Sequence, residues 1–242
     1  MERKIAIVTG AGSGVGRAVA LTLAREGKKL IVVGRSEGNT RETARMAAEY
    51  TEVTPVIADV GTAEGAERYF GAALDQYGRI DILAHCAARF QPAVALAEAG
   101  VDLFDDVFRI NAKGTFLAMQ HALRQMEKQG SGVIVNVSSH DGLFADPLHG
   151  IYSASKHAVI GMTKNAAVEY GPKGIRVCAV CPGVIDTKMI ADIIDQIPPE
   201  VCGPMRRPAQ AQEIADAVCY LCSDQASYLN GVILRADGGM GL

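Results

Sequence analysis

Short apolar runs and amphipathic helical patterns alternate along most of this chain. Runs of valine, isoleucine and leucine without polar alternation are typical of strands that are buried on both faces of a sheet. Because parallel strands need crossover helices, the alternation predicts an α/β fold, with a doubly wound parallel sheet of about seven strands and helices on both faces. The predicted strands are 4–9, 30–33, 53–58, 80–84, 132–138, 175–181 and 232–235.

The predicted helices lie at 15–26, 37–50, 63–77, 101–129, 152–170 and 210–222. No repeat or long linker interrupts the pattern, so residues 1–242 are predicted to form a single domain. The least regular stretch, 182–208, is rich in proline, and we expect residues 184–208 to form a lid over a substrate. Within it, the apolar side chains of Met189, Ile190 and Ile193 either contact the substrate or pack as a helix core.

Composition narrows the possible partners. The chain has 242 residues, of which 49% are hydrophobic, and 24 basic residues against 27 acidic ones give a net charge of −3. This near-balance removes the electrostatic case for a nucleic acid or an anionic membrane as the main partner. No apolar stretch reaches the roughly 20 residues of a membrane span, and no export signal follows the first methionine. We therefore expect a cytoplasmic protein that acts on a small molecule.

The six cysteines are expected to be reduced thiols, although two Cys-x-x-Cys pairs raise the alternative of a zinc site. Cys178 and Cys181 fall in a predicted strand, where residues three apart face opposite sides. Cys219 and Cys222 fall in a predicted helix, where cysteine packs as a small apolar residue. The five histidines show no metal-binding spacing, so the sequence predicts no metal site.

A glycine-rich turn joins the first predicted strand to the first helix. Gly10, Gly14 and Gly16 form a G-x-x-x-G-x-G pattern that also contains Ser13 and Val15. Glycine allows a tight turn and lets backbone N–H groups approach a pyrophosphate, while the helix N-terminus adds a favourable dipole. At the start of a doubly wound sheet, the pattern favours a Rossmann-type dinucleotide site over an ordinary glycine-rich turn.

The end of the second strand indicates which dinucleotide is bound. An acidic residue at this position would bind the ribose hydroxyls of NAD, whereas arginine suits the 2′-phosphate of NADP. The sequence places Arg35 and Ser36 there, with Glu37 as counter-evidence. NADP is therefore favoured over NAD, although NAD stays open. Asp59 and Val60, which close the third strand, are candidates for contact with the adenine ring.

Tyr152 and Lys156 form the candidate reactive pair. A spacing of four residues places a phenol and an ammonium on one face of a helix. A nearby ammonium favours the phenolate and lowers the pKa of a tyrosine, which makes it a better proton donor near neutral pH. Ser138 and Ser139 end a neighbouring strand, where a serine hydroxyl can orient a carbonyl or alcohol oxygen beside the tyrosine.

Taken together, these motifs resemble those of the short-chain dehydrogenases/reductases, in order and spacing, from about residue 4 to residue 239. The set comprises Thr9–Gly16, Asp59-Val60, Asn111, Ser139, Tyr152-x-x-x-Lys156 and Pro182-Gly183-x-x-x-Thr187. The resemblance implies that Tyr152 is the general acid/base and that Lys156 tunes its pKa and binds the nicotinamide ribose. It also implies that Ser139 stabilises the substrate and that Asn111 holds a water in a proton relay.

The resemblance further implies a cofactor site and an assembly. Pro182, Gly183, Val184, Ile185 and Thr187 would border the nicotinamide end of the cofactor. A homo-oligomer, tetramer or dimer, would pack through the helices that carry Asn111 and Tyr152.

One segment departs from the family pattern. The family usually has Asn-Asn-Ala-Gly after the fourth strand, whereas this chain has His85-Cys86-Ala87-Ala88. His85 is expected to replace in part the hydrogen bonds by which the first asparagine ties neighbouring strands. Ala87 remains a candidate cofactor contact, while Ala88 puts a methyl group where glycine lets the backbone lie close to the ribose. Cys178 likewise stands where the family commonly has asparagine.

The sequence thus favours an NAD(P)-dependent oxidoreductase that interconverts an alcohol with a ketone or aldehyde. Two alternatives stay open: a 3-oxoacyl-carrier-protein reductase and a non-catalytic dinucleotide-binding sensor. His140, Asp141, Phe144 and His149, which lie between the serine and the tyrosine, either line the substrate pocket or are ordinary surface loop residues.

Overall fold

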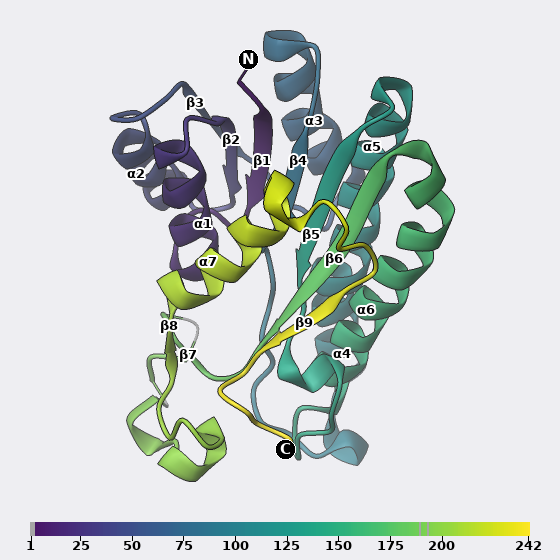
Figure 1. Ribbon diagram of the computed structural model, residues 1–242. Helices are drawn as coiled ribbons and strands as arrows, with labels where there is room; N and C mark the ends of the chain where they lie inside the picture. The colour runs from purple at the N-terminus through teal and green to yellow at the C-terminus, as the bar shows by residue number, and fades with distance from the viewer. Residues whose placement is uncertain (1–2, 189, 193) are drawn as a thin grey trace.

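A computed structural model describes residues 3–188, 190–192 and 194–242 of the protein. Its central sheet consists of β1 (Ile5–Thr9), β2 (Lys29–Gly34), β3 (Val53–Ile57), β4 (Ile82–His85), β5 (Gly132–Val137), β6 (Ile175–Pro182) and β9 (Ile233–Ala236). All neighbours pair in parallel, in the order β3-β2-β1-β4-β5-β6-β9 (Figure 1). This arrangement confirms the predicted doubly wound sheet, and each predicted strand agrees with an observed one to within two residues at either end.

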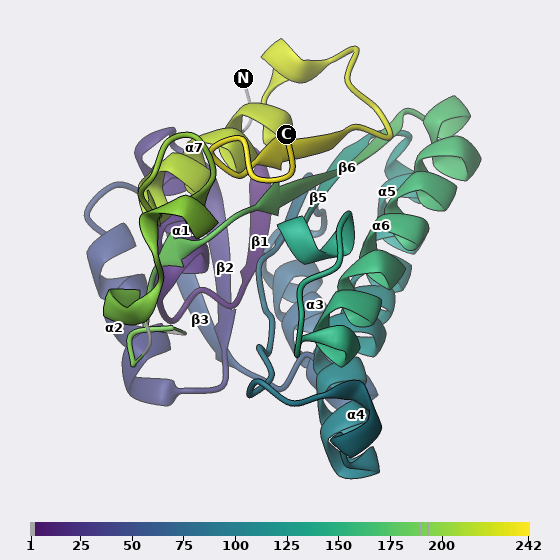
Figure 2. The same cartoon turned by 90° about the horizontal axis from the view of Figure 1, so that it is seen from below.

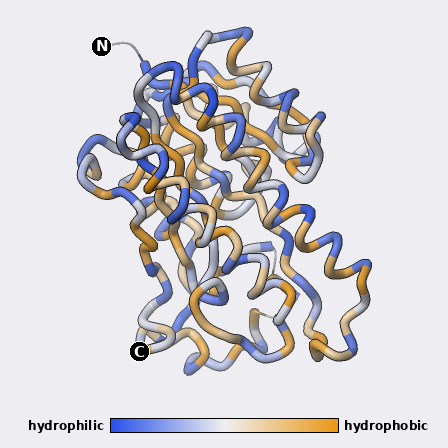
Figure 3. The backbone as a smooth tube through the Cα atoms, turned by 90° about the vertical axis from the view of Figure 1, so that its right-hand side faces the viewer, coloured by the Kyte–Doolittle hydropathy of each residue, from blue (hydrophilic) through white to orange (hydrophobic). Residues whose placement is uncertain are grey.

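The strands are continuous apolar runs because both faces of the sheet are covered. In β1, Ala6 and Val8 face one apolar cluster, whereas Ile7 faces the other. The first cluster is covered by α1 (Gly14–Arg25), α2 (Glu37–Ala47) and α7 (Ala211–Cys222), and the second by α3 (Ala63–Tyr77), α5 (Gly114–Gln129) and α6 (Gly150–Tyr170) (Figures 1 and 2). Figure 3 shows hydrophobic residues along the central strands and more hydrophilic positions on the outer helices.

The predicted long helix at 101–129 is interrupted by a wider turn. It consists of α4 (Val101–Phe108), one π-helical turn (Arg109–Lys113) and α5. The π turn holds Asn111, which is 1% exposed. π-helical turns are rare in proteins, and those that occur are often found at functional sites. The hydrophobic pattern of the sequence does not reveal this one, because the apolar face of the helix continues through it.

Two short strands were not predicted from the sequence. β7 (Ile185–Asp186) pairs in parallel with β8 (Ala209–Gln210), and the chain between them extends beyond the strand ends of the main sheet (Figure 1). Strands of two residues leave no periodicity to detect. Met189 and Ile193, two of the apolar residues expected in the lid, lie outside the described residues. Single 3₁₀ turns occur at Leu96–Glu98, His140–Gly142, Gly171–Lys173, Ile194–Gln196, Pro199–Cys202 and Asp224–Ala226.

All six cysteines are free, and Cys178, Cys219 and Cys222 pack within the apolar cluster beneath α1 and α7. Within the described part of the chain, no helix is long and apolar enough to span a membrane.

Candidate active site

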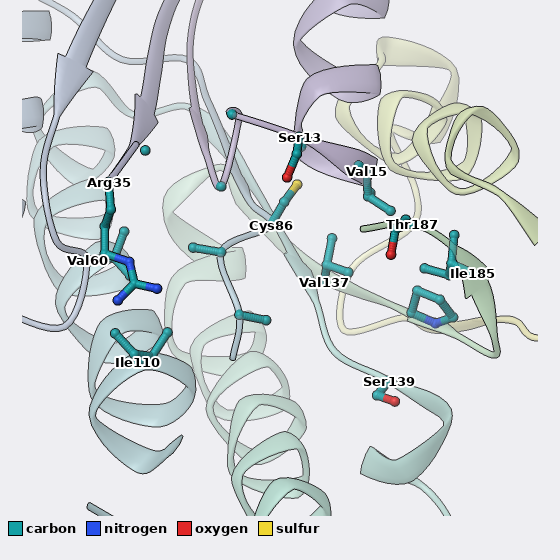
Figure 4. A pocket seen from close by; sticks show the side chains of 18 of the residues that line it. Ser13, Val15, Arg35, Val60, Cys86, Ile110, Val137, Ser139, Ile185 and Thr187 are labelled. Carbon is teal, nitrogen blue, oxygen red and sulfur yellow. The ribbon is translucent and has the colours of Figure 1, made fainter. Parts of the chain in front are cut away.

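The main cleft, with a volume of about 360 Å³, lies at the carboxyl ends of the strands. β1 pairs with β2 on one side and β4 on the other, so the connections leave in opposite directions and open a crevice there. Most residues that the sequence proposed for cofactor binding line this cleft (Figure 4). They are Gly10, Ser13, Gly14, Val15, Gly16, Arg35, Ser36, Val60, Ala87, Tyr152, Lys156, Pro182, Gly183, Ile185 and Thr187, and Ser139 joins them.

The glycine-rich turn is shaped by positions where a side chain does not fit. Gly10 and Gly14 have left-handed φ values of +66° and +51°, a conformation that side chains disfavour. A Cβ on Gly16 would lie 2.3 Å from the carbonyl oxygen of Gly10. One on Gly14 would lie 3.3 Å from the methyl group of Thr187, so the turn is in contact with the segment after β6. The turn therefore presents bare backbone to the cleft.

The amino end of α1 faces this turn without a side-chain cap. Ser13 is the N-cap residue, and its hydroxyl makes no capping hydrogen bond. The first N–H groups of a helix have no partner within the helix and carry a partial positive charge. These groups are available to an anionic group bound in the cleft.

Arg35 is the cationic side chain at the end of β2. It is exposed, and no hydrogen bond or ion pair joins it to another described residue. In Figure 4 its guanidinium extends into the cleft on the side of Val60 and Ile110. Ser36 is the N-cap of α2 and makes no capping hydrogen bond either. Both side chains are free to bind a phosphate.

Two of the proposed cofactor residues, Asp59 and Val184, do not line the main cleft. The carboxylate of Asp59 lies 2.7 Å from Nη1 of Arg109 and accepts a hydrogen bond from the backbone N–H of Gly61. Burial by itself would raise the pKa of the Asp59 carboxyl group. The hydrogen bonds from Gly61 and Arg109 have the larger combined effect, so the pKa of Asp59 is lowered. Asp59 thus ties the β3–α3 turn to the helix that carries Asn111.

Tyr152 lies in the first turn of α6 and is nine-tenths buried. The ring of Phe90 packs edge-on against it, with 4.9 Å between centroids. Burial raises the pKa of the Tyr152 hydroxyl, and a hydrogen bond with Ser139 opposes the rise. Burial thus outweighs the lowering that the sequence predicts, and the phenol is held in its protonated, proton-donating form.

Lys156 is buried one turn further along α6. Its ammonium donates a hydrogen bond of 3.0 Å to the carbonyl oxygen of Val137 and lies 5.6 Å from the Tyr152 ring centroid. Burial lowers the pKa of Lys156 from 10.5 to about 8. At neutral pH this helix therefore holds a buried positive charge beside the phenol, at a cost in folding free energy.

We predict that Lys156→Met stabilises the folded protein by about 1–2 kcal/mol at pH 7, because methionine fills the space without a buried charge. The folded pKa of Lys156 is below its ordinary value, so the wild-type chain gains stability as the pH rises from about 8 to about 10.5. The advantage of the variant should shrink over that range. Urea unfolding at several pH values measures this, with the exposed Lys164→Met as control. A variant less stable than wild type at pH 7 would contradict the prediction.

Asn111 joins the π turn to α6 and to the chain after β4. Its amide donates to Oγ of Ser155 at 3.0 Å and to the carbonyl oxygen of Arg89 at 2.9 Å, and its oxygen accepts from the Arg89 N–H. Both amide hydrogens are therefore engaged within the protein. Asn111 does not line the cleft itself, and the visible role of its side chain is to hold α6 in place.

Gln91 holds the first turn of α6 from the other side, and the sequence reasoning did not name it. Its side-chain oxygen accepts a hydrogen bond of 2.6 Å from the N–H of Tyr152, and its amide donates to the carbonyl oxygen of Leu148. Gln91 is 2% exposed. A lone glutamine in an irregular segment carries no sequence signal for such a role.

His85 links β4 to β1, as expected for a substitute of the family asparagine. Its Nδ1 lies 3.0 Å from Oγ1 of Thr9, which also accepts a hydrogen bond from the N–H of Ala87. Burial lowers the pKa of His85 to about 3, so the imidazole is neutral. Ala88 lines the cleft with Cys86 and Ala87, which places its methyl group beside the space for a ligand.

The cleft also contains residues that the sequence reasoning did not assign to the cofactor site. They come from the turn after β1, the end of β2, the start of α2, the end of β3, the π turn and the end of β5: Gly12, Gly34, Asn39, Thr40, Ala58, Ile110 and Val137. Asn39 and Thr40 follow the end of β2 within a few residues. This position near a strand end was the only sequence feature that could have identified them as cleft residues.

Comparisons with known proteins agree with this geometry. A family model described as enoyl-(acyl carrier protein) reductase matches residues 10–241. Levodione reductase from Leifsonia aquatica is 38% identical over 252 residues, covering 98% of this chain and 93% of the relative. Cis-4-hydroxycyclohexanecarboxylate dehydrogenase from Sinomonas cyclohexanicum is 35% identical over 238 residues, covering 98% and 96%.

Solved structures with both nicotinamide cofactors share the fold. The structure of ElxO with NADP bound has a TM-score of 0.92 at 29% identity, covering 99% of each chain. The structure of NAD⁺-bound xylitol dehydrogenase has a TM-score of 0.93 at 29% identity, covering 98% of each chain.

Proposed function

Since the chain belongs to the short-chain dehydrogenase/reductase family, we propose that it interconverts a secondary alcohol and a ketone with NADP as the preferred cofactor. The observation that carries the proposal is the convergence of Tyr152, Ser139 and Lys156 in the same cleft as the glycine-rich turn. The relatives named above reduce or oxidise substrates at a CH–OH centre, which supports the same reaction class for this chain.

The residues of the cleft fit a nicotinamide dinucleotide. The turn at Gly10–Gly16 offers bare backbone and the uncapped amino end of α1 to a pyrophosphate. Arg35 and Ser36 follow the end of β2, the position at which an acidic residue binds the adenosine ribose or a basic one accepts its 2′-phosphate in such folds. Thr187 and Ile185 lie on the side of the cleft away from Arg35 (Figure 4), and Tyr152 and Lys156 line the same cleft. When bound, the cofactor supplies the hydride that is exchanged with the substrate carbon.

The chain itself manages the proton. In the direction of reduction, the Tyr152 hydroxyl donates a proton to the substrate oxygen, and in the direction of oxidation the phenolate removes one. The Ser139 hydroxyl, which is hydrogen-bonded with Tyr152, orients the same oxygen. The Lys156 ammonium stabilises the negative charge that develops on the phenolate. Asn111 and Gln91 hold α6 so that these groups keep their places.

The preference for NADP rests on Arg35. No other described residue pairs with its guanidinium, and it is directed into the cleft. A guanidinium binds phosphate with two parallel charge-assisted hydrogen bonds, whereas it offers no comparable gain to ribose hydroxyls. We further propose that residues 184–208 form the substrate lid and that the chain works as a homo-oligomer.

The proposal is tested by screening the purified protein against a panel of alcohols and carbonyl compounds with NADPH, NADH and their oxidised forms. The panel should include substituted cyclohexanones and cyclohexanols, in view of the relatives. We expect a cofactor-dependent change in nicotinamide absorbance with at least one compound, and faster turnover with the phosphorylated cofactor. Absence of turnover across the panel, together with tight cofactor binding, would favour a dinucleotide sensor.

A 3-oxoacyl-carrier-protein substrate is the second enzymatic candidate, because the 3-oxoacyl-[acyl-carrier-protein] reductase of Thermotoga maritima is 34% identical over 243 residues. A 3-oxoacyl thioester in the same panel separates the two. Preference for the thioester over all free ketones by at least tenfold in kcat/KM would favour the carrier-protein reductase.

A further inference from the structure

Three side chains between β5 and α6 form a group that the proposed hydride transfer does not use. They are Asp141, Asp146 and His149, and one carboxylate oxygen or ring nitrogen of each lies within 4.8 Å of the others. The sequence predicts no metal site because the spacing matches no known motif. The fold of the loop nevertheless gathers three ligand-type side chains at one place.

The buried member of the group has no partner. Asp141 is 8% exposed, and no hydrogen bond or ion pair joins its carboxylate to another described residue. Its backbone is well fixed, because its N–H donates to Oγ of Ser139 and its carbonyl oxygen accepts from Oγ of Ser153 at 2.7 Å. Its oxygens are not among the fully buried side-chain atoms that lack a hydrogen-bond partner, so solvent or an ion can reach the carboxylate.

The helix dipole does not account for this carboxylate. A carboxylate that caps α6 would accept a hydrogen bond from one of its first N–H groups. The N–H of Tyr152 instead donates to Gln91, and that of Ser153 donates to the carbonyl oxygen of His149. No side-chain cap is found at this end of α6. The Asp141 carboxylate is therefore free of helix capping, and one of its oxygens lies within 4.8 Å of ligand atoms of Asp146 and His149.

The other two members have the separation of metal ligands. Nδ1 of His149 lies 3.3 Å from Oδ2 of Asp146, with which it is hydrogen-bonded, so a bound ion would replace this hydrogen bond. Two ligand atoms at about 2.0–2.1 Å from one zinc ion, at a tetrahedral angle, are about 3.3–3.4 Å apart. The Asp146 side chain is 49% exposed, so an ion can enter from solvent and the carboxylate can turn toward it.

We propose that Asp141, Asp146 and His149 bind one divalent transition-metal ion, with zinc as the best fit. Two carboxylates and one imidazole suit borderline ions such as Zn²⁺, whereas Mg²⁺ and Ca²⁺ prefer ligands that are all oxygen. The ion would leave at least one coordination position to water, because the described residues supply three ligands.

This site lies beside the proposed substrate position. The ring of His149 packs on Phe90 at 4.8 Å, and Phe90 packs on Tyr152 at 4.9 Å. An ion held by His149 would therefore fix the loop after β5 against the same aromatic contact that borders Tyr152. The expected consequence is slower backbone hydrogen exchange in residues 140–150 when the ion is bound.

Calorimetric titration of the tag-free protein with Zn²⁺ tests the proposal without using turnover, so its outcome is independent of the proposed reaction. We expect one saturable ion per chain. Asp146→Asn and His149→Gln should each weaken the affinity at least about tenfold, and Asp141→Asn should do the same. Asp75→Asn, an exposed substitution on α3, is the matched control and should bind as the wild type does.

Co²⁺ as a second probe identifies the ligands. Its visible absorption should lack a thiolate charge-transfer band, and the spectrum should change in His149→Gln. Three results would overturn the proposal: no saturable binding up to about 1 mM, equal binding in the loop variants, or a thiolate band that assigns the ion to cysteine. If Zn²⁺ does not bind, the remaining interpretation is that the Asp141 carboxyl group is protonated.

Discussion

Replacement of Tyr152 by phenylalanine should reduce kcat by about 10²–10⁴-fold while the protein still binds its cofactor. The substitution removes only the hydroxyl that donates the proton and leaves the ring packed against Phe90. The buried position that raises the pKa of Tyr152 keeps water from taking over as an efficient proton donor. The affinity for the cofactor should fall at most about tenfold, which is the value of one neutral hydrogen bond.

Turnover in both directions and the dissociation constant of the cofactor, followed by nicotinamide fluorescence, measure the two effects separately. Tyr170→Phe, at the far end of the same helix, is the matched control and should retain full activity. Activity of Tyr152→Phe within about fivefold of wild type would refute the role of the tyrosine. A parallel loss of cofactor binding would instead assign Tyr152 to the binding of the cofactor.

Replacement of Arg35 by aspartate should change the preference between the two cofactors by at least about 100-fold. Each hydrogen bond from a guanidinium to a phosphate is worth about 1.5–3 kcal/mol, and the introduced carboxylate repels the same phosphate. An acidic side chain at the end of β2 can accept hydrogen bonds from ribose hydroxyls, so use of NAD should be retained or improved.

The ratio of kcat/KM for NADP to that for NAD, measured with one substrate, gives the result. Arg41→Asp provides the matched control, because it makes the same change of charge on α2 while its side chain pairs with Glu37 at the surface. That variant should leave the ratio within about threefold of wild type. An equal loss with both cofactors in Arg35→Asp would show that Arg35 does not distinguish them.

Several of these expectations depend on groups that the sequence proposed because of their positions relative to strands and helices. The glycines of the first turn follow a strand and precede a helix, and the left-handed φ values of Gly10 and Gly14 give the physical reason for their presence. Arg35 was found in the same way, by its place at a strand end. Tyr152 and Lys156 share a helix face because of their spacing.

Other features of the site depend on contacts between distant parts of the chain. Gln91, which is 61 residues from Tyr152 in the sequence, accepts a hydrogen bond from the Tyr152 N–H. Arg109, which is 50 residues from Asp59, donates a hydrogen bond to the Asp59 carboxylate, which does not line the cleft. The π turn that carries Asn111 is hidden by a continuous apolar face. Burial, which sets the pKa values of Tyr152 and Lys156, is likewise a property of the packed fold.

The sequence by itself determined the parallel sheet and its helices on both faces, and it placed Tyr152 and Lys156 on one helix face as the candidate reactive pair. Apolar periodicity, glycine geometry and helical spacing are local properties, so a single chain shows them directly. Only the tertiary structure decided how those groups are held and charged, and that Asp141, Asp146 and His149 meet in one loop. Such features depend on the separation of side chains in space and on their exclusion from water, neither of which is encoded by spacing along the chain.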